Sequence, residues 1–378
     1  MRKTTFSLLC LEGAVLSFNV AASSALVPSI AREFNVSEFV AGRIMWLYML
    51  AYGVAALFYG PLVRKFNAKK VELVCFFLFC AANLFAAFAA NIRILYASRV
   101  LMGVFGASVV PLVLILISQY GEPENKGKLT GIFFSATFVA SLLGLSLSAV
   151  LPWRMIYFLP AVFGFLVWVH MYWYLQDFKA TTGSFAAHYN KVFRNKTVVL
   201  VLSYIFLVSF FYHGVQQWLA VFFSKAYGFD QFLISTLITL TSLSGIIGEV
   251  AGGCFSDSLG RLKVVNLGIA LMILSVLTLC VKLPFPAIAI VMLVWGFGWT
   301  LNHAGLSTLL TDLPKEFINE SAGLNSSIRF ISAGIGVTIG SILLQKSFLL
   351  HYGVFAGGLL LLLLLSNKFL PGNLKGGI

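Results

Sequence analysis

The chain has 378 residues, of which 60% are hydrophobic and only 10% are charged. A soluble globular domain has roughly 25% charged residues, so this composition excludes a soluble protein and indicates an integral membrane protein. In a soluble protein the net charge of +13 would suggest a nucleic-acid partner. In a membrane protein the placement of the charges reports topology instead, and we expect no nucleic acid as a partner.

Stretches of about 20 mostly apolar residues, the length that crosses a bilayer as a helix, recur along the whole chain. They do not show the short alternating pattern of a β-barrel. The predicted spans, in chain order, are 5–30, 40–62, 71–90, 94–119, 128–151, 153–176, 197–224, 231–255, 264–281, 284–311, 319–345 and 348–367. The sequence therefore predicts an all-α polytopic membrane protein with twelve transmembrane helices.

The first span follows Met1-Arg2-Lys3 and contains small residues at 21–25, a pattern also found in cleavable signal peptides. Its apolar stretch is too long for a signal peptide, and removing it would leave an uneven number of spans. The five cysteines lie in or beside apolar spans without the spacing of metal ligands. We therefore expect a retained first helix, no bound metal and no cofactor.

Lys and Arg gather on one side of the predicted membrane. With both termini inside, and with residues at the ends of spans counted with the adjoining loop, 17 of the 26 lie on the inner side, 7 on the outer side and 2, Arg99 and Arg329, deep within spans. The positive-inside rule then predicts a multi-pass protein of the cytoplasmic membrane with both termini in the cytoplasm. The longest loop, 177–196, is predicted to be a cytoplasmic linker between 1–176 and 197–378. An amphipathic, phospholipid-contacting role is the alternative for this loop.

An internal repeat relates the two parts of the chain with an offset of 193 positions, as between residues 60 and 253. Residues 253–263 are echoed at 60–70, and residues 293–298 are echoed at 100–105. Each half then holds six spans. Because six is even, both halves cross the membrane in the same sense, which predicts a parallel 6+6 repeat about an axis along the membrane normal.

Three short motifs are specific in combination. They are Gly253, Asp257, Gly260 and Arg261, with a partial copy at Gly60, Lys65, Lys69 and Lys70; Arg99, Gly103 and Gly106; and Trp153 with Arg154. With them the chain resembles the major facilitator superfamily over essentially its whole length. The resemblance implies two six-helix bundles around a central cavity. It also implies a gating contact between the halves, made by Gly60, Arg64, Gly253, Asp257, Gly260 and Arg261.

The chain resembles the drug/proton antiporter branch most, with two departures. Residues 140–148 contain one glycine and lack the Gly-Pro pair usual in the fifth helix of that branch. The resemblance therefore supports the prediction of transport more strongly than the prediction of export. Arg64 also replaces the loop carboxylate in the first copy of the gating motif. That exchange favours a gate formed mainly by the second copy, and the alternative for the motif is a tight charged turn.

Ionisable groups inside spans are costly, by ~3 kcal/mol at a helix centre, and therefore point to mechanism. Counting about 1.5 Å per residue places Glu12, Glu249 and His303 roughly 10–12 Å from the inner side and Arg329 about 16 Å from it. We expect Glu249 to be the protonation site, with Arg329 or His303 beside it and Glu12 as a second acid or a contact for a cationic group. A structural ion pair is the alternative for Glu249, and snorkelling to the inner interface is the alternative for Glu12.

Arg99 lies nearer the outer side, where Asn19 or Ser23 is at a suitable depth to contact it. In proton-coupled relatives the arginine of this motif is linked to proton coupling, which the resemblance implies here. Polar and aromatic residues on helices expected near the cavity suit stacking, cation–π contacts or hydrogen bonds to an amphipathic solute. These substrate candidates are Asn19, Tyr48, Tyr52, Tyr204, His213, Gln216, Gln217, Trp295, Trp299, Asn302 and Asn325. For each of them, packing between helices is the alternative.

No nucleotide-binding loop is present, so ion or solute gradients are the expected energy source. We therefore predict a secondary active transporter that works by alternating access, as a monomer, and exports a small amphipathic organic solute in exchange for protons. Proton-driven uptake of a small metabolite is the first alternative, and a membrane sensor without transport is the second. An enzyme is not expected, since no catalytic motif is found in the loops.

Overall fold

The computed structural model describes residues 3–120, 122, 126–177, 193–311 and 318–370, and only the backbone at 64, 118, 119, 126–128, 257, 310, 311 and 318–323. Two compact units are formed. Unit 1 comprises Met1–Ala187 and Phe229–Ser235, and unit 2 comprises His188–Gly228 and Thr236–Ile378. Most of the predicted linker, residues 178–192, lies outside the described part of the chain.

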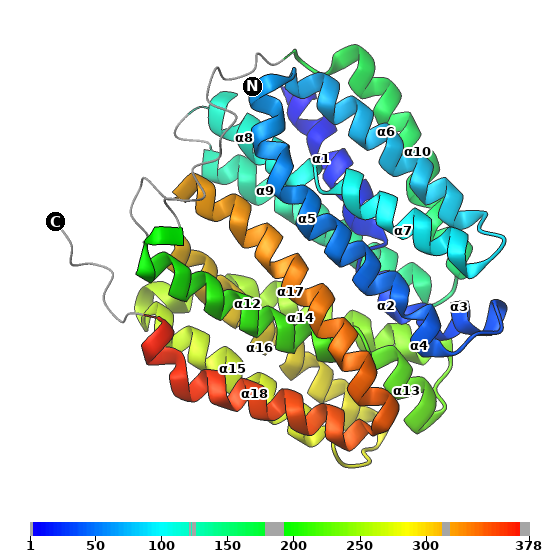
Figure 1. Ribbon diagram of the computed structural model, residues 1–378, viewed down its shortest axis with the longest axis vertical. Helices are drawn as coiled ribbons and strands as arrows, with labels where there is room; N and C mark the ends of the chain where they lie inside the picture. Colours follow the sequence, from blue (N-terminus) through cyan, green and yellow to red (C-terminus); the bar gives the residue numbers. More distant parts are fainter. Residues whose placement is uncertain (1–2, 121, 123–125, 178–192, 312–317, 371–378) are drawn as a thin grey trace. The chain divides into compact units, whose positions relative to one another are not determined.

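Twelve helical stretches in the described part are long and apolar enough to cross a membrane, and each corresponds to one predicted span (Figure 1). The prediction of an all-α protein with twelve spans is therefore confirmed. Several of these spans contain short breaks, so more than twelve helices are labelled.

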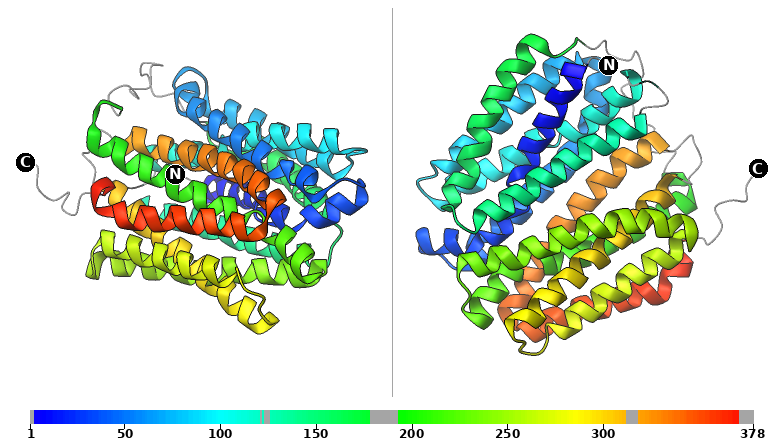
Figure 2. Two further views of the ribbon diagram at one scale, coloured as in Figure 1. Left: turned by 60° about the horizontal axis from the view of Figure 1, so that its bottom comes forward. Right: turned by 180° about the vertical axis from the view of Figure 1, so that it is seen from behind.

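Unit 1 is built from ten helices and the start of an eleventh. They are α1 (Lys3–Phe18), α2 (Ala22–Ala25), α3 (Val27–Glu33), α4 (Glu38–Ala41), α5 (Arg43–Lys65), α6 (Ala68–Ala87), α7 (Ile92–Gly106), α8 (Val109–Tyr120), α9 (Lys126–Ser148), α10 (Trp153–Tyr174) and the first turn of α14 (Gln231–Ser258). Figure 2 shows α1 between α9 and α10, and α6 packs against both α7 and α10. The core of unit 1 is therefore centred on α1 and α6.

Unit 2 contains the rest of α14 and six further helices. These are α12 (Lys196–Gln216), α13 (Leu219–Tyr227), α15 (Arg261–Thr278), α16 (Phe285–Thr311), α17 (Ile318–Lys346) and α18 (Phe348–Phe369). Helix α12 packs along α17 and α18, as Figure 1 shows, and α15 packs along α16 and α18.

Side-chain caps explain where several of these helices begin. Ser37, Asn67, Asn91, Asn195 and Ser347 each accept a hydrogen bond from a backbone N–H in the first turn of the helix that follows. Such caps satisfy donors that have no partner within the helix, and each stabilises a helix start by ~1 kcal/mol. Polar caps beside apolar stretches thus mark where five of the spans begin.

Four spans are interrupted by a short turn: α1 ends at Phe18 before α2, α4 ends at Ala41 before α5, α7 ends at Gly106 before α8, and α12 ends at Gln216 before α13. At the first break the backbone N–H of Val20 donates to the carbonyl of Ser17, which is a tighter turn than the α-helix makes. Because this change keeps the chain apolar, the hydropathy pattern did not reveal it.

Candidate functional site

An ion pair inside unit 2 joins Glu249 on α14 to His303 on α16. The Nδ1 atom of His303 lies 3.0 and 3.2 Å from the two carboxylate oxygens of Glu249, and both side chains are about one-third exposed. Glycines allow this approach, because a Cβ atom at Gly296 of α16 would lie only 2.0 Å from the carbonyl oxygen of Thr241 on α14. Of the two partners predicted for Glu249, the structure pairs it directly with the histidine.

Arg329 on α17 interacts electrostatically with Glu249 and His213 without forming an ion pair within 4.0 Å of the carboxylate. Only 9% of Arg329 is exposed. Its Nε donates a hydrogen bond to Oδ1 of Asn325 at 2.9 Å. Its two terminal nitrogens have no hydrogen-bond partner among the described residues. A buried guanidinium with unused donors is costly unless an acceptor reaches it, so this position suits a solute oxygen or a carboxylate.

An aromatic wall adjoins these charges. The ring of Tyr212 on α12 is stacked on Trp299 of α16, with centroids 3.8 Å apart, and on Trp295, at 5.1 Å. His213 meets the face of Trp299 edge-on at 5.6 Å, and Trp299 in turn lies 6.0 Å from His303. Five of the predicted candidates from four helices are therefore neighbours: Glu249, His303, Arg329, His213 and Trp299. We refer to these five residues as the unit 2 cluster.

The two glutamines at the end of α12 are buried, each with 8% of its surface exposed. Gln216 accepts a hydrogen bond from Nε1 of Trp295 at 2.6 Å and donates to the hydroxyl of Thr241 at 3.4 Å. Gln217 occupies the break between α12 and α13. Gln216 therefore fixes the indole of the aromatic wall and has its amide already engaged.

Tyr204 and Asn302 do not join this cluster, although both were predicted to bind solute. Tyr204 packs against Phe369 of α18 with ring centroids 5.9 Å apart, and it is fully buried. Asn302 donates to the carbonyl of Val265 on α15 at 3.2 Å and is also fully buried. Both lie on the faces of α12 and α16 that pack inside the bundle, which depth along the helix cannot indicate.

In unit 1, Arg99 on α7 is 1% exposed and lies over an aromatic platform. Its guanidinium carbon is 4.3 Å from the centre of the Tyr48 ring and 5.9 Å from that of Tyr157, and Tyr52 extends the platform beside Tyr48. Its Nε donates to the carbonyl of Ile44 at 3.1 Å. A buried cation is stabilised here by cation–π contacts and a backbone carbonyl.

The residues predicted as partners of Arg99 have other contacts, which corrects that expectation. Asn19 donates to Oδ1 of Asn83 on α6. The hydroxyl of Ser23 lies 3.1 Å from that of Tyr157 and donates to the carbonyl of Asn19. Depth in the membrane correctly indicated that Ser23 lies near Arg99 and its aromatic platform. It could not indicate that Asn19, directly after α1, points toward α6.

Glu12 is fully buried in α1 and interacts with Glu72 of α6, which is 1% exposed. Glu12 therefore does not snorkel to the inner interface, because its carboxyl group is enclosed by unit 1. Sequence reasoning missed Glu72, which stands near the start of a predicted span and resembles an interface residue. A glutamate followed by twenty uncharged residues was the signal that could have found it.

The two copies of the gating motif start their helices differently. Gly260 has φ +94°, a conformation that favours glycine, and it precedes α15, which begins at Arg261. Asn67, at the matching position of the first copy, has φ −62° and caps α6 through its side chain. At Gly60 and Gly253 an added Cβ would meet no described atom within 4 Å. The side chains of Arg64 and Asp257 lie outside the described residues, so the gating contact stays a prediction.

Trp153 and Arg154 at the start of α10 bind Glu33 of α3. Arg154 lies 2.6 Å from the carboxylate of Glu33 and also donates to the carbonyls of Ala87 and Ala89 at 2.8 and 2.9 Å. Nε1 of Trp153 donates to the second carboxylate oxygen. This motif therefore ties α3 and the end of α6 to α10.

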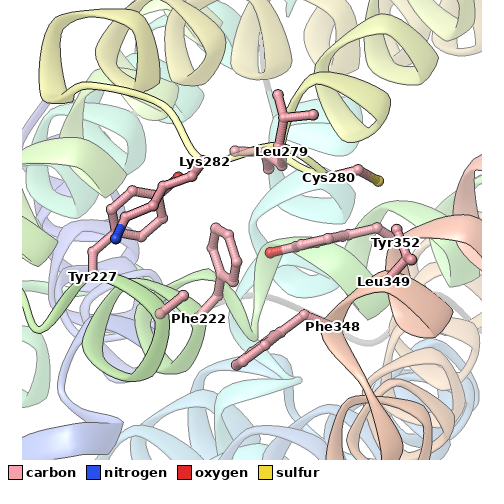
Figure 3. Close-up of a pocket in the computed structure, with 10 residues that line it drawn as sticks. Phe222, Tyr227, Leu279, Cys280, Lys282, Phe348, Leu349 and Tyr352 are labelled. Atoms are coloured by element: carbon pink, nitrogen blue, oxygen red, sulfur yellow. The ribbon is translucent and has the colours of Figure 1, made fainter.

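A separate cavity of about 240 Å³ lies in unit 2 beside the 279–282 segment (Figure 3). Its lining consists of Phe222, Ala226, Tyr227, Leu279, Cys280, Val281, Lys282, Phe348, Leu349 and Tyr352. Figure 3 shows Lys282 beside Tyr227 and the rings of Phe222, Phe348 and Tyr352 around the opening. None of the predicted solute or proton residues lines it, so it is distinct from the unit 2 cluster.

Comparison with known proteins gives a consistent family. The purine ribonucleoside efflux pump NepI of Salmonella typhimurium (strain LT2) is 24% identical over 352 residues, which cover 89% of this chain and 86% of that protein. The human organic anion transporter MFSD10 (TETRAN) superposes with a TM-score of 0.75 at 15% identity, covering 96% of this chain and 97% of that one. The xylose transporter XylE from E. coli superposes with a TM-score of 0.76 at 14% identity, covering 99% of each chain.

At these identities the two solved structures show a shared fold and no more. The sequence profile of the Major Facilitator Superfamily matches residues 9–337, which is most of the chain. The twelve spans and the internal repeat agree with that match. The chain therefore belongs to the Major Facilitator Superfamily and is a membrane transporter.

Proposed function

We propose that this transporter exports a small, amphipathic organic solute across the cytoplasmic membrane in exchange for protons. The observation that carries the proposal is the unit 2 cluster, in which a partly exposed carboxylate, a histidine, a buried arginine with unused donors and an aromatic wall are neighbours. Such a group of ionisable residues inside spans is costly and is a functional site by default.

Glu249 is the proposed proton carrier. Its carboxylate is held by His303 and is one-third exposed, so a proton can reach it. When Glu249 is protonated, its negative charge no longer attracts Arg329 or the ring of His303, and both side chains are left to interact with a solute. Proton binding and solute binding at neighbouring groups are then linked, which is the requirement for coupled transport.

The aromatic wall and Arg329 define the solute class. The exposed part of the stacked Tyr212–Trp299 pair suits a flat ring, and the free guanidinium donors suit an oxygen acceptor or a negative charge. The relative named as a purine ribonucleoside efflux pump and the structural neighbour named as an organic anion transporter are consistent with this chemistry. We therefore assign a solute that joins a flat ring to a polar or anionic group.

The proposed orientation places both termini in the cytoplasm, because 17 of the 26 Lys and Arg then lie on the inner side. Alternating access of one solute site to the two sides is the proposed mechanism, with the two copies of the gating motif as the cytoplasmic gate. We expect a monomer to suffice, because the unit 2 cluster is built from one chain.

Flux measurements on purified protein in liposomes test this proposal. Vesicles loaded with candidate solutes, ring-containing anions and nucleosides among them, are given a pH gradient in either direction. For protein oriented as in the cell, we expect solute to leave the side that corresponds to the cytoplasm as protons enter it. Accumulation in the same direction as the protons would indicate uptake instead, and binding without any flux would indicate a sensor.

A further inference from the structure

Two glutamates lie close together inside unit 1, and the mechanism proposed above uses neither of them. Glu12 on α1 is fully buried and Glu72 on α6 is 1% exposed. Their carboxyl groups interact electrostatically, and none of the four carboxyl oxygens has a hydrogen-bond partner in the described part of the chain.

Side chains of α1 and α6 meet beside Gly106, the last residue of α7, and help to hold this pair in place. A Cβ atom added at Gly106 would lie 2.7 Å from Leu16 of α1 and 3.1 Å from Phe79 of α6, so the two helices meet at that glycine. Leu16 is one turn beyond Glu12, and Phe79 is two turns beyond Glu72, so each pair shares a helix face. Further along, Asn19, the first residue after α1, donates to Asn83 of α6. The same two faces therefore stay in contact from the asparagine pair to the glutamate pair.

The remaining titratable groups that interact with the pair are Cys75 and Cys80 of α6 and Tyr59 of α5. The hydroxyl of Tyr59 donates to the carbonyl of Val104 at 2.7 Å, and the thiol of Cys75 donates to the hydroxyl of Tyr59 at 3.7 Å. No Lys, Arg or His of the described residues is among the groups that act on the pair. Among the described side chains, no cation therefore balances two negative charges at this place.

We propose that Glu12 and Glu72 share one proton and form a second proton-binding site, in unit 1. Two carboxylates in contact cannot both ionise without a cation between them, whereas a carboxylic acid that donates to a carboxylate satisfies both groups with one strong hydrogen bond. The pair titrates as a unit and not as two separate residues. This proton site would be present whichever solute the protein transports and in whichever direction.

Infrared spectroscopy of the full-length purified protein at neutral pH counts protonated carboxyl groups through their carbonyl stretch. We expect wild type to show one more protonated carboxyl group than the Glu12→Gln/Glu72→Gln double variant. Glu33→Gln is the matched control and should leave the band unchanged, since Glu33 is an ion-paired carboxylate. A difference of zero would mean that both glutamates are ionised, and a difference of two that both are protonated; either result overturns the proposal.

The pH dependence of thermal stability gives a second readout. In the unfolded chain both carboxyl groups ionise above their ordinary pKa of about 4.3, whereas the folded pair keeps one proton because two buried like charges would repel. Wild type should therefore lose stability as the pH rises from about 5 through neutrality, until the folded pair releases its proton. The double variant cannot form these charges, and we expect that loss to disappear. If the double variant does not fold, Glu72→Gln alone serves, because the introduced amide donates to Glu12 in place of the proton. A stability profile identical to that of wild type above about pH 5 would overturn the proposal.

Discussion

Replacing Gly336 by alanine is expected to separate α17 from α12 by about 1.2 Å. A Cβ atom at this position would lie 2.2 Å from the carbonyl oxygen of Phe210 on α12, whereas ordinary contacts begin at 3.4 Å, and the difference is the displacement required. The obstacle is backbone, so no side-chain rotation can relieve it. Overpacking of this kind costs about 1–3 kcal/mol, which exceeds the gain of about 1 kcal/mol that alanine brings to a helix interior.

The same displacement should weaken solute binding. Arg329 lies two turns before Gly336 on α17, and its carbonyl accepts a hydrogen bond from Ser209 of α12 at 3.0 Å. Moving α17 therefore moves the guanidinium away from His213 and Tyr212 on α12. The thermal unfolding midpoint and the affinity for a transported solute measure the two effects.

Gly353→Ala in α18 is the control, since an added Cβ there meets no described atom within 4 Å. The control should unfold at or above the wild-type midpoint and bind solute normally. If Gly336→Ala is as stable as Gly353→Ala and binds solute equally well, the close packing of α12 and α17 does not position Arg329 for solute binding.

Three further changes have defined outcomes. Arg99→Lys removes the hydrogen bond from Nε to the Ile44 carbonyl and the planar contact with Tyr48. It should lower the free energy of unfolding by about 2 kcal/mol, measured by thermal unfolding. An unchanged unfolding midpoint would contradict the claim that the aromatic rings stabilise the buried arginine. Trp299→Leu should raise the KM for a ring-containing solute about tenfold at similar maximal flux, which corresponds to a loss of ~1.4 kcal/mol of solute-binding free energy. An unaltered KM would show that the aromatic wall does not contact the solute. Glu33→Gln breaks a partly exposed ion pair and should cost less than about 1 kcal/mol; a larger loss would show that this pair holds α3 and α10 together.

The sequence predicted the spans well because the thickness of the bilayer fixes their length and polarity. It did not predict the break after Phe18 or the one after Gly106, since a turn changes backbone hydrogen bonds and not hydropathy. The starts of α6 and α12 were easier to place, because Asn67 and Asn195 are polar residues at the edge of apolar stretches.

The candidate site was predicted in part. Depth along the helices correctly placed Glu249, His303 and Arg329 in one neighbourhood, because rise per residue is constant in a helix. Depth says nothing about rotation around the helix axis. For that reason Asn302 turned out to face α15, and the partner of Glu12 was overlooked.

Transport by the Glu249→Gln variant in liposomes tests the central claim most directly. The amide keeps the size of the side chain but cannot carry a proton. We expect this variant to exchange labelled for unlabelled solute across the membrane and to fail to move solute against its gradient when a pH gradient is imposed. Flux driven by the pH gradient at the wild-type level would contradict the proposal that Glu249 couples protons to the solute.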